Sequence, residues 1–177
     1  MNTRVGDDYP QQLIGELNLV SGKVHVGDGQ FIPGDPSFIG MLDSAVYEVW
    51  VKVASTEDGD RVRCLWMVRP GFVTTQKAEA GSTWADTATI GFCDSSLAEP
   101  EYTVEQNDEY LDRLWKATES AQYAAFTPLE GVVGKVFVAS SGFGDGDFLV
   151  EYLLDSQGGK GGLIVTFFKW GQLYSSE

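Results

Sequence analysis

The chain has 177 residues, of which 43% are hydrophobic and 12% are aromatic. It carries 12 Lys and Arg side chains against 26 Asp and Glu, so its formal net charge at pH 7 is −14. The aromatic content argues against disorder and the length suits one hydrophobic core, so we expect a single domain over residues 1–177. The negative charge disfavours nucleic-acid phosphates and anionic lipids as partners, and it favours basic proteins or cations.

The absence of targeting signals and the small number of cysteines indicate the cellular compartment. No apolar run reaches the roughly 20 residues of a membrane span, and residues 1–10 lack the basic and apolar regions of a signal peptide. We therefore expect a cytoplasmic protein. Cys64 and Cys93 are the only cysteines, and each lies in an apolar, strand-like stretch. We expect two free buried thiols rather than a disulfide.

Most of the chain alternates apolar and polar residues with a period of two, which is typical of short β-strands. The clearest pair, residues 46–54 and 61–69, lies on either side of a Glu-Asp-Gly-Asp turn signal and predicts a hairpin. In its second strand Val62, Cys64 and Trp66 are expected on one face. Further strands are expected at 13–20, 23–26, 87–93, 132–139, 147–154 and 163–168. The last is apolar on both faces, which is typical of a central strand.

Apolar residues recur at helical spacing between residues 105 and 122, which predicts one main amphipathic helix. Thr103 followed by Gln106 fits a capping box at its start. The Gly- and Pro-rich stretches 27–40 and 156–162 are interpreted as loops. Together these elements predict a mainly β, α+β fold: an antiparallel sheet, as a sandwich or a partly rolled barrel, with the helix packed against it.

The segment between the strands at 132–139 and 147–154 is the candidate ligand-binding site. Glycines at three of five positions permit positive φ and a close approach of the backbone to another group. Two interpretations stay open: a turn that joins two strands, or a loop that cradles a ligand. The candidate binding residues are Ser140, Ser141, Gly142, Gly144, Asp145, Gly146 and Asp147.

Asp145 and Asp147 are also the candidate metal ligands, because hard cations such as Ca²⁺ take carboxylate oxygens from loops of this kind. The EF-hand pattern is absent, since Leu149 and Ser156 occupy the fifth and twelfth positions counted from Asp145. Any Ca²⁺ site would need ligands from elsewhere in the chain. We expect no cofactor, with Ca²⁺ as the one alternative.

Catalytic residues are not assigned. His25 is the only histidine, on a short strand where a surface position is expected. Neither a Ser-His-Asp nor a Cys-His arrangement can be assembled from the sequence, and a zinc site of His25, Cys64 and Cys93 lacks any short ligand spacing. A pair of catalytic carboxylates, as in glycosidases, is an alternative that no particular residues support. The sequence therefore favours a protein that is not an enzyme.

Residues 138–148 read VASSGFGDGDF and are followed by a strand, a turn and LIVTF at 163–167. This ending resembles a bacterial family of unknown function, domain of unknown function family 4241. Weaker similarity covers residues 19–24 and 90–95, whereas Phe148 and Leu149 stand where the family tends to have Tyr and Pro. The resemblance implies a mainly β domain from a bacterium or its phage, and it supplies no catalytic residues.

The leading functional hypothesis is a non-catalytic, acidic protein-interaction module, such as an immunity-like or inhibitory partner of another protein. Its basis is the charge, the aromatic content and the lack of a catalytic constellation. A small-ligand or Ca²⁺-binding β domain, with hydrolytic activity as one option, is the alternative from another class. An acidic mimic of nucleic acid is the third.

Overall fold

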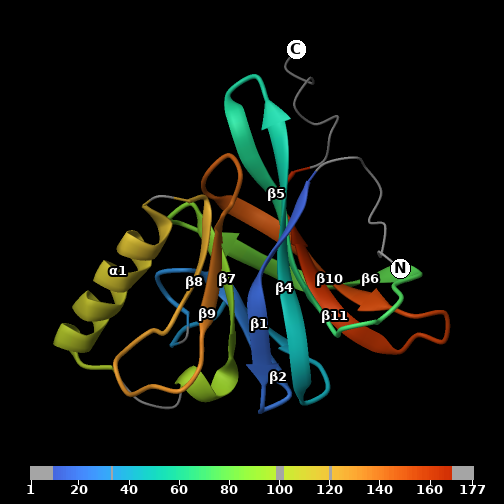
Figure 1. Cartoon of the computed structure of the whole chain (residues 1–177), viewed down its shortest axis with the longest axis horizontal. Coiled ribbons are helices and arrows are strands. Elements are labelled where there is room, and N and C mark those ends of the chain that lie inside the picture. The colour runs from blue at the N-terminus through green and yellow to red at the C-terminus, as the bar shows by residue number, and fades with distance from the viewer. Residues whose placement is uncertain (1–9, 33, 99–101, 120, 169–177) are drawn as a thin grey trace.

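The computed structural model describes residues 10–32, 34–98, 102–119 and 121–168. Within them the chain forms two antiparallel sheets and two helices (Figure 1). Sheet A runs in the order β1 (Gln11–Leu19), β4 (Ala45–Thr56), β5 (Gly59–Val68), β11 (Lys160–Thr166), β10 (Gly146–Leu154) and β6 (Gln76–Ala85). Sheet B runs in the order β3 (Phe38–Met41), β2 (Lys23–Asp28), β7 (Thr89–Asp94), β9 (Val136–Ser140) and β8 (Tyr123–Phe126). The helices are the 3-10 helix η1 (Ser95–Ala98) and the α-helix α1 (Val104–Thr118).

Both sheets contribute to the main hydrophobic core. Leu17, Val49 and Leu65 from sheet A are buried in one cluster with Phe92 and Phe137 from sheet B. Burial of such side chains stabilises the fold by about 1.5–3 kcal/mol each. The described strands leave open edges at β1 and β6 in sheet A and at β3 and β8 in sheet B, so neither sheet closes into a barrel. The fold is therefore the mainly β, sandwich-like α+β class that the sequence predicts.

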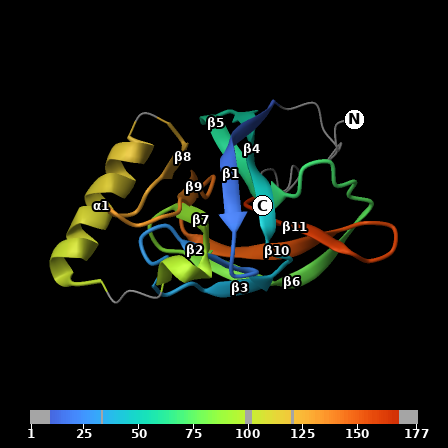
Figure 2. The same ribbon diagram turned by 60° about the horizontal axis from the view of Figure 1, so that its bottom comes forward.

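Helix α1 covers the outer face of sheet B, and both views place it beside β8 (Figures 1 and 2). Tyr110 and Leu114 are its buried residues, packed in a second cluster with β-strand residues. The predicted capping box is confirmed, because Thr103 Oγ1 accepts from the Gln106 amide and Gln106 Oε1 accepts from the Thr103 amide. α1, the one α-helix among the described residues, is neither long nor apolar enough to span a membrane.

The helix ends at Thr118 rather than at residue 122 as predicted. Thr118 Oγ1 donates to the Leu114 carbonyl at 2.9 Å, and a side-chain bond of this kind competes with the backbone ladder. The next strand is β8, which begins at Tyr123 and which the sequence analysis did not predict. The early end matters for the site below, because it opens a gap between α1 and the strands.

The hairpin of β4 and β5 is confirmed, with Thr56 and Gly59 as the last paired residues. The predicted face of β5 is partly wrong. The register shifts after the pair of Lys52 and Cys64, so Val62 lies in the main core whereas Cys64 and Trp66 lie in the cluster on the other face. An extra residue at a β-bulge reverses the alternation, which a strict period of two cannot predict.

Strand β11 is confirmed as central, since it pairs with β5 on one side and β10 on the other. Strands β3 and β6 were missed, and the stretch 27–40 is not all loop. Gly40 in β3 stands where a Cβ would lie 2.5 Å from Leu163 Cδ1, and Gly81 in β6 stands where one would lie 2.9 Å from the Phe38 ring. Glycine suits these close approaches. Because it has no side chain, it also interrupts the alternation of apolar and polar residues from which a strand is predicted.

Both cysteines are free and buried, as predicted. Burial raises the pKa of the Cys64 thiol to about 11, and burial, followed by the charge of Asp94, raises the pKa of Cys93 well above its usual value. His25 was predicted on the surface, and this is wrong: it is only 7% exposed. Its strand β2 lies between β3 and β7, so no edge of β2 is left open beside His25.

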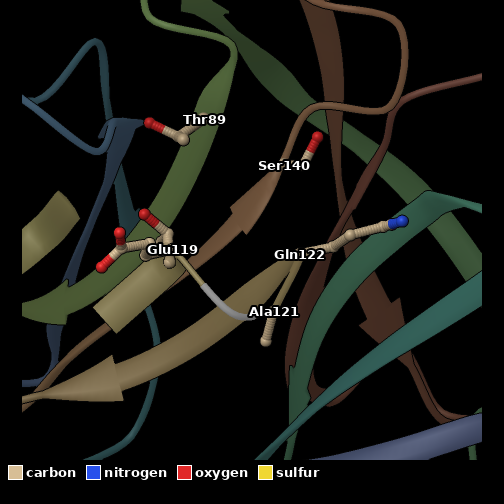
Figure 3. A pocket seen from close by; sticks show the side chains of 6 residues that line it. Thr89, Glu119, Ala121, Gln122 and Ser140 are labelled. Carbon is tan, nitrogen blue, oxygen red and sulfur yellow. The ribbon is translucent and has the colours of Figure 1, made fainter. Parts of the chain in front are cut away.

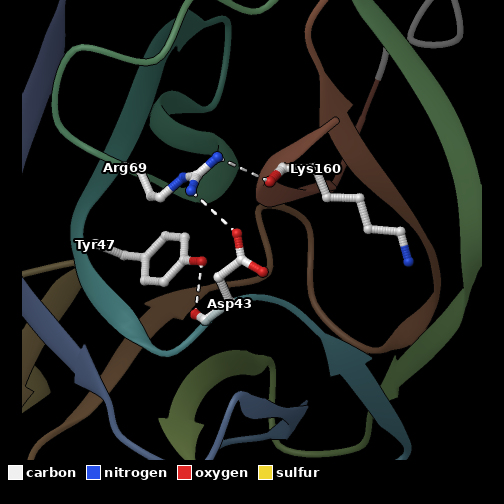
Figure 4. A network of polar contacts seen from close by, with 4 residues as sticks. All are labelled: Asp43, Tyr47, Arg69 and Lys160. Atoms are coloured by element: carbon white, nitrogen blue, oxygen red, sulfur yellow. Dashed lines mark hydrogen bonds and ion pairs between the residues drawn. The ribbon is translucent and has the colours of Figure 1, made fainter. Parts of the chain in front are cut away.

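A polar network closes the end of sheet A where β4 begins (Figure 4). Arg69 donates to Asp43 Oδ2 at 3.0 Å and to the Lys160 carbonyl at 3.3 Å. The Tyr47 hydroxyl donates to the Asp43 carbonyl at 2.9 Å, and burial raises the pKa of Tyr47. These bonds tie the turn before β4 to the ends of β5 and β11. The opposite end of these strands, where β4 joins β5, is described in the next section.

Candidate functional site

Several connections meet at the end of the molecule where β4 joins β5. They are the start of the β2–β3 connection, the β6–β7 connection, the β9–β10 connection, the β4–β5 turn and the C-terminus of α1, and hydrogen bonds or the lining of one pocket link each to the next. We call this region the loop end. The sequence-predicted glycine segment is one of its five parts.

A buried carboxylate holds two of these connections together. Asp28, at the end of β2, is 1% exposed. Its Oδ1 accepts from the Gln30 amide at 2.8 Å and from Thr87 Oγ1 at 2.6 Å. Its Oδ2 accepts from the amides of Asp86 and Thr87 at 2.6 and 2.7 Å. Four hydrogen bonds satisfy this buried group, so its role is to fix the backbone of the β6–β7 connection.

The other side of that connection is held by the glycine segment. The Ala88 amide donates to Asp145 Oδ1 at 2.9 Å, and the Ser141 amide donates to the Ala88 carbonyl at 2.9 Å. Ala88 has a φ of 55°, a left-handed conformation that costs a non-glycine residue about 1–2 kcal/mol. Such a conformation persists where the surroundings over-determine the backbone. The loop end is thus firmly braced from both sheets.

The glycine segment connects two strands, as one of the two interpretations holds, but it does not form a hairpin. β9 lies in sheet B and β10 in sheet A, so the segment crosses between the layers. Gly142 has a φ of +81° and Gly144 a φ of +112°, and the buried Ser141 hydroxyl donates to the Gly144 carbonyl. The positive φ values let the chain leave one sheet and enter the other within six residues.

A cavity of about 360 Å³ lies between the C-terminus of α1 and the strands β7 and β9 (Figure 3). It is lined by Thr89, Thr118, Glu119, Ala121, Gln122 and Ser140. Thr89 and Ser140 are direct partners across β7 and β9, so their side chains start from adjacent points of the sheet. We call this cavity the α1 pocket. It borders the glycine segment, because Ser140 is the last residue before the chain crosses over.

Gln122 joins the α1 pocket to the β4–β5 hairpin. Its Nε2 donates to the Asp60 carbonyl at 2.6 Å, and its backbone carbonyl accepts from the Ser140 amide at 2.7 Å. Its side-chain oxygen Oε1 is buried, and no described residue donates a hydrogen bond to it. A buried acceptor without a donor costs about 1–3 kcal/mol. Because Oε1 is buried, a group bound in the pocket does not reach it, and Gln122 is a structural link between β8 and the hairpin.

The chemistry of the α1 pocket is that of an acceptor site. Its side chains supply hydroxyls, an amide and the carboxylate of Glu119, and none of the six lining residues is a Lys, Arg, His or Cys. The C-terminal carbonyls of α1 add partial negative charge at the same place. This lining attracts donors and cations, and its residue types do not make a nucleophile with a histidine base.

Exposed acids lie on most of the connections of the loop end. They come from the β4–β5 turn, the β6–β7 connection, the end of α1, and the glycine segment with the start of β10. The exposed acids are Glu57, Asp58, Asp60, Asp86, Glu119, Asp145 and Asp147. The loop end therefore carries seven of the protein's 26 acidic side chains on adjacent connections.

Two aromatic groups lie exposed among these acids. Phe143 in the glycine segment is 47% exposed, and its ring packs edge-on against Phe168 at 5.1 Å. The Arg61 guanidinium carbon lies 5.9 Å from the Phe143 ring centre. Trp84, opposite Asp147 in the β6–β10 pair, forms the second group with Phe31.

The seven predicted binding residues do not form one site. Ser140 lines the α1 pocket, Ser141 and Gly142 are buried supports, and Asp145 bonds to the Ala88 amide. Asp147 is exposed on β10. In the part of the chain that the structure describes, no group of three His, Cys, Asp or Glu side chains could hold a metal ion. The Ca²⁺ site at Asp145 and Asp147 stays a prediction without a third ligand among those residues.

Sequence reasoning missed Asp28, Thr89, Glu119 and Gln122. They lie far apart along the chain, and none belongs to a motif of fixed spacing, so only the fold brings them together. The Asp-Gly pair at Asp28 was a visible signal, but it reads as a turn wherever it occurs.

A second cavity, of about 430 Å³, lies at the other end of sheet B beside Asp94 and Ser96. Asp94 Oδ2 accepts from the Ser21 amide at 3.0 Å and Oδ1 accepts from the Ser96 amide at 2.8 Å. Burial acts to raise the pKa of Asp94, but these bonds from Ser96 and Ser21 outweigh it and lower the pKa. Asp94 is therefore a structural carboxylate at that end, as Asp28 is at the loop end.

No protein-family model, curated protein or solved structure matches the chain. The resemblance to domain of unknown function family 4241 therefore stays a prediction. The functional argument depends on the loop end alone.

Proposed function

We propose that the protein is a non-catalytic interaction module that binds a basic protein partner through the loop end, as an immunity-like or inhibitory protein does. The observation that carries the proposal is the loop end itself: seven exposed carboxylates on adjacent connections, with Phe143 exposed among them. Clustered charge of one sign steers a partner of the opposite sign, and an exposed aromatic side chain supplies the anchor that such interfaces favour.

The bracing of the loop end supports the same function. Asp28 and Asp145 fix the β6–β7 connection from two sides, and Phe143 packs on Phe168. Ordering flexible loops on binding costs affinity, so a surface that is already fixed binds more tightly for the same contacts. The braced acidic end is what a binding surface needs.

The experiment is capture from a lysate of the source cells, at low and high salt, with three forms of the tagged protein. The first is the wild type. The second removes three carboxylates of the loop end (E57Q, D58N, D147N), and the third removes three exposed carboxylates elsewhere (E16Q, D108N, E130Q). Both triple variants have the same net charge, so they separate the location of charge from its amount.

We expect a stoichiometric basic partner on the wild type and on the control variant, and its loss from the loop-end variant. High salt should weaken the capture, because exposed charges are screened beyond about 10 Å at 0.1 M salt. A captured set made only of DNA-binding proteins would favour the nucleic-acid mimic instead. Equal capture by all three forms would contradict the proposal.

A further inference from the structure

We propose that the α1 pocket receives a lysine or arginine side chain of the basic partner. This inference rests on the proposed function and names the group that the partner presents to it. Its basis is a cavity of about 360 Å³ whose lining side chains supply hydroxyl, amide and carboxylate oxygens.

The lining offers oxygen atoms from three parts of the chain. Figure 3 shows Thr89 and Ser140 on neighbouring strands with Glu119 at the end of α1 across from them. Thr118 Oγ1 donates its hydrogen to the Leu114 carbonyl, so only its lone pairs are left for a group in the pocket. Lys and Arg side chains are donors only, with three and five N–H groups. A cationic group of either kind fits this set, whereas an anion does not.

Glu119 gives the second reason. It is the one charged residue among the six that line the pocket. A bond from an ammonium or guanidinium group to its carboxylate is charge-assisted, and charge-assisted bonds are stronger than neutral ones.

Charge and size agree with this occupant. Glu119 and the C-terminus of α1 make the pocket negative, and Asp60 lies beside it on the hairpin. A volume of about 360 Å³ is at the small end of ligand sites, which suits one long side chain. An apolar side chain would leave the polar lining without partners, and that costs free energy.

The pocket is tested first without any partner, on the ¹⁵N-labelled full chain. The probes are N-acetyl-lysine methylamide and N-acetyl-arginine methylamide, with N-acetyl-norleucine methylamide as the uncharged control of similar length. We expect saturable shifts at millimolar concentrations in the amide signals of Thr89, Ser140 and Gln122 for the two cations, and none for norleucine. Equal shifts for norleucine, or no shift for any probe, would overturn the inference.

Variants locate the binding. Ala121→Leu places a larger side chain at the pocket wall and should abolish the shifts, whereas Ala125→Leu, at an exposed position of β8 outside the pocket, should keep them. Glu119→Gln should weaken the binding about threefold, the effect of removing one exposed charge. Melting temperatures of the three variants check that the fold is intact. Unchanged binding in folded Ala121→Leu would overturn the inference.

Partner capture then separates this inference from the proposed function. If Ala121→Leu loses both the lysine probe and the protein partner, while Ala125→Leu keeps both, the partner fills the α1 pocket. If Ala121→Leu loses the probe but still captures the partner, the inference is wrong and the proposed function stands. If the loop-end triple variant captures the partner as well as the wild type does, the proposed function fails whatever the probes show.

Discussion

The loop end contains the dipeptide Asp-Gly three times, and the two copies that contact the β6–β7 connection do different things. Asp28-Gly29 and Asp145-Gly146 both hold the connection between β6 and β7. Asp28 is buried and accepts four hydrogen bonds, whereas Asp145 is exposed and accepts one, from the Ala88 amide. The same dipeptide is therefore a buried structural element at Asp28 and part of the exposed surface at Asp145.

The difference comes from what covers each copy. Asp28 is the last residue of β2 in sheet B, whose outer face lies under α1. The Tyr110 hydroxyl of that helix donates to the Gly29 carbonyl at 2.5 Å. Burial raises the pKa of Tyr110 well above its usual value, so the hydroxyl keeps its proton. Asp145 lies in the crossover between sheets, which no helix covers among the described residues. Whether such an aspartate is buried or exposed therefore depends on the elements packed over it and not on the dipeptide itself.

The largest effect should come from the buried copy. Asp28→Ala removes the acceptor of four hydrogen bonds and leaves the amides of Gln30, Asp86 and Thr87 without it. Because unsatisfied buried donors are costly, we expect a loss of about 3 kcal/mol or more in the free energy of unfolding. Urea unfolding followed by tryptophan fluorescence measures it. A loss below about 1 kcal/mol would contradict the structural role.

Asp28→Asn sharpens the same point with nearly unchanged shape. Each carboxylate oxygen of Asp28 accepts from at least one backbone amide, so either orientation of an asparagine amide sets its NH₂ group against an N–H donor. We expect a loss of about 2 kcal/mol, smaller than that of Asp28→Ala. An unchanged stability would show that the shape of Asp28 matters and its acceptors do not.

The sequence predicted the fold where the period of two was clean. β4, β5, β10 and β11 were found, and the helix was found with its cap at Thr103. β3 and β6 were missed because close packing between the sheets requires Gly40 and Gly81, and a glycine carries no side chain that a pattern could register.

The candidate site was predictable only in part. The glycine segment could be recognised because its conformation depends on its own residues, Gly142 and Gly144. The α1 pocket could not, because Thr89, Glu119 and Gln122 come together only after two sheets and a helix have packed. Acidic composition predicted the kind of surface, whereas its location depends on which connections share an end of the sandwich.

Asp94 extends the comparison to the other end of sheet B, with an effect of intermediate size. Hydrogen bonds from Ser96 and Ser21 outweigh burial and lower the pKa of Asp94 in the folded protein. A depressed folded pKa means that the unfolded chain binds the proton more readily. The stabilisation is therefore fully present above the unfolded pKa of about 3.9 and is lost as the pH falls through the lower, folded value.

The measurement is the midpoint of urea unfolding of the wild type and Asp94→Asn between pH 6 and pH 2. We expect Asp94→Asn to be less stable by about 1 kcal/mol at pH 6, since an amide keeps only part of the bonding. The difference should shrink toward pH 2. A difference that stays constant with pH would show that Asp94 does not contribute through its charge.

The smallest effects should come from the exposed copy and its neighbour. Asp145→Ala removes the one bond from the Ala88 amide, which water can replace in part, so we expect a loss of about 0.5–1 kcal/mol. Asp147→Asn, also exposed, makes no such bond and should change the stability by less than about 0.5 kcal/mol.

The hydrogen-exchange rate of the Ala88 amide shows whether Asp145 fixes the backbone or only adds surface charge. The Ala88 amide is held in a left-handed conformation by Asp145 on one side, while the Ala88 carbonyl is held by Ser141 on the other. Without the Asp145 carboxylate we expect this amide to exchange faster, and with Asp147→Asn we expect the wild-type rate. Because both changes remove one exposed negative charge, a difference between them reports the bond. Equal rates in the two variants would mean that Asp28 alone fixes the β6–β7 connection, and that the exposed Asp145 serves only as charge for a partner.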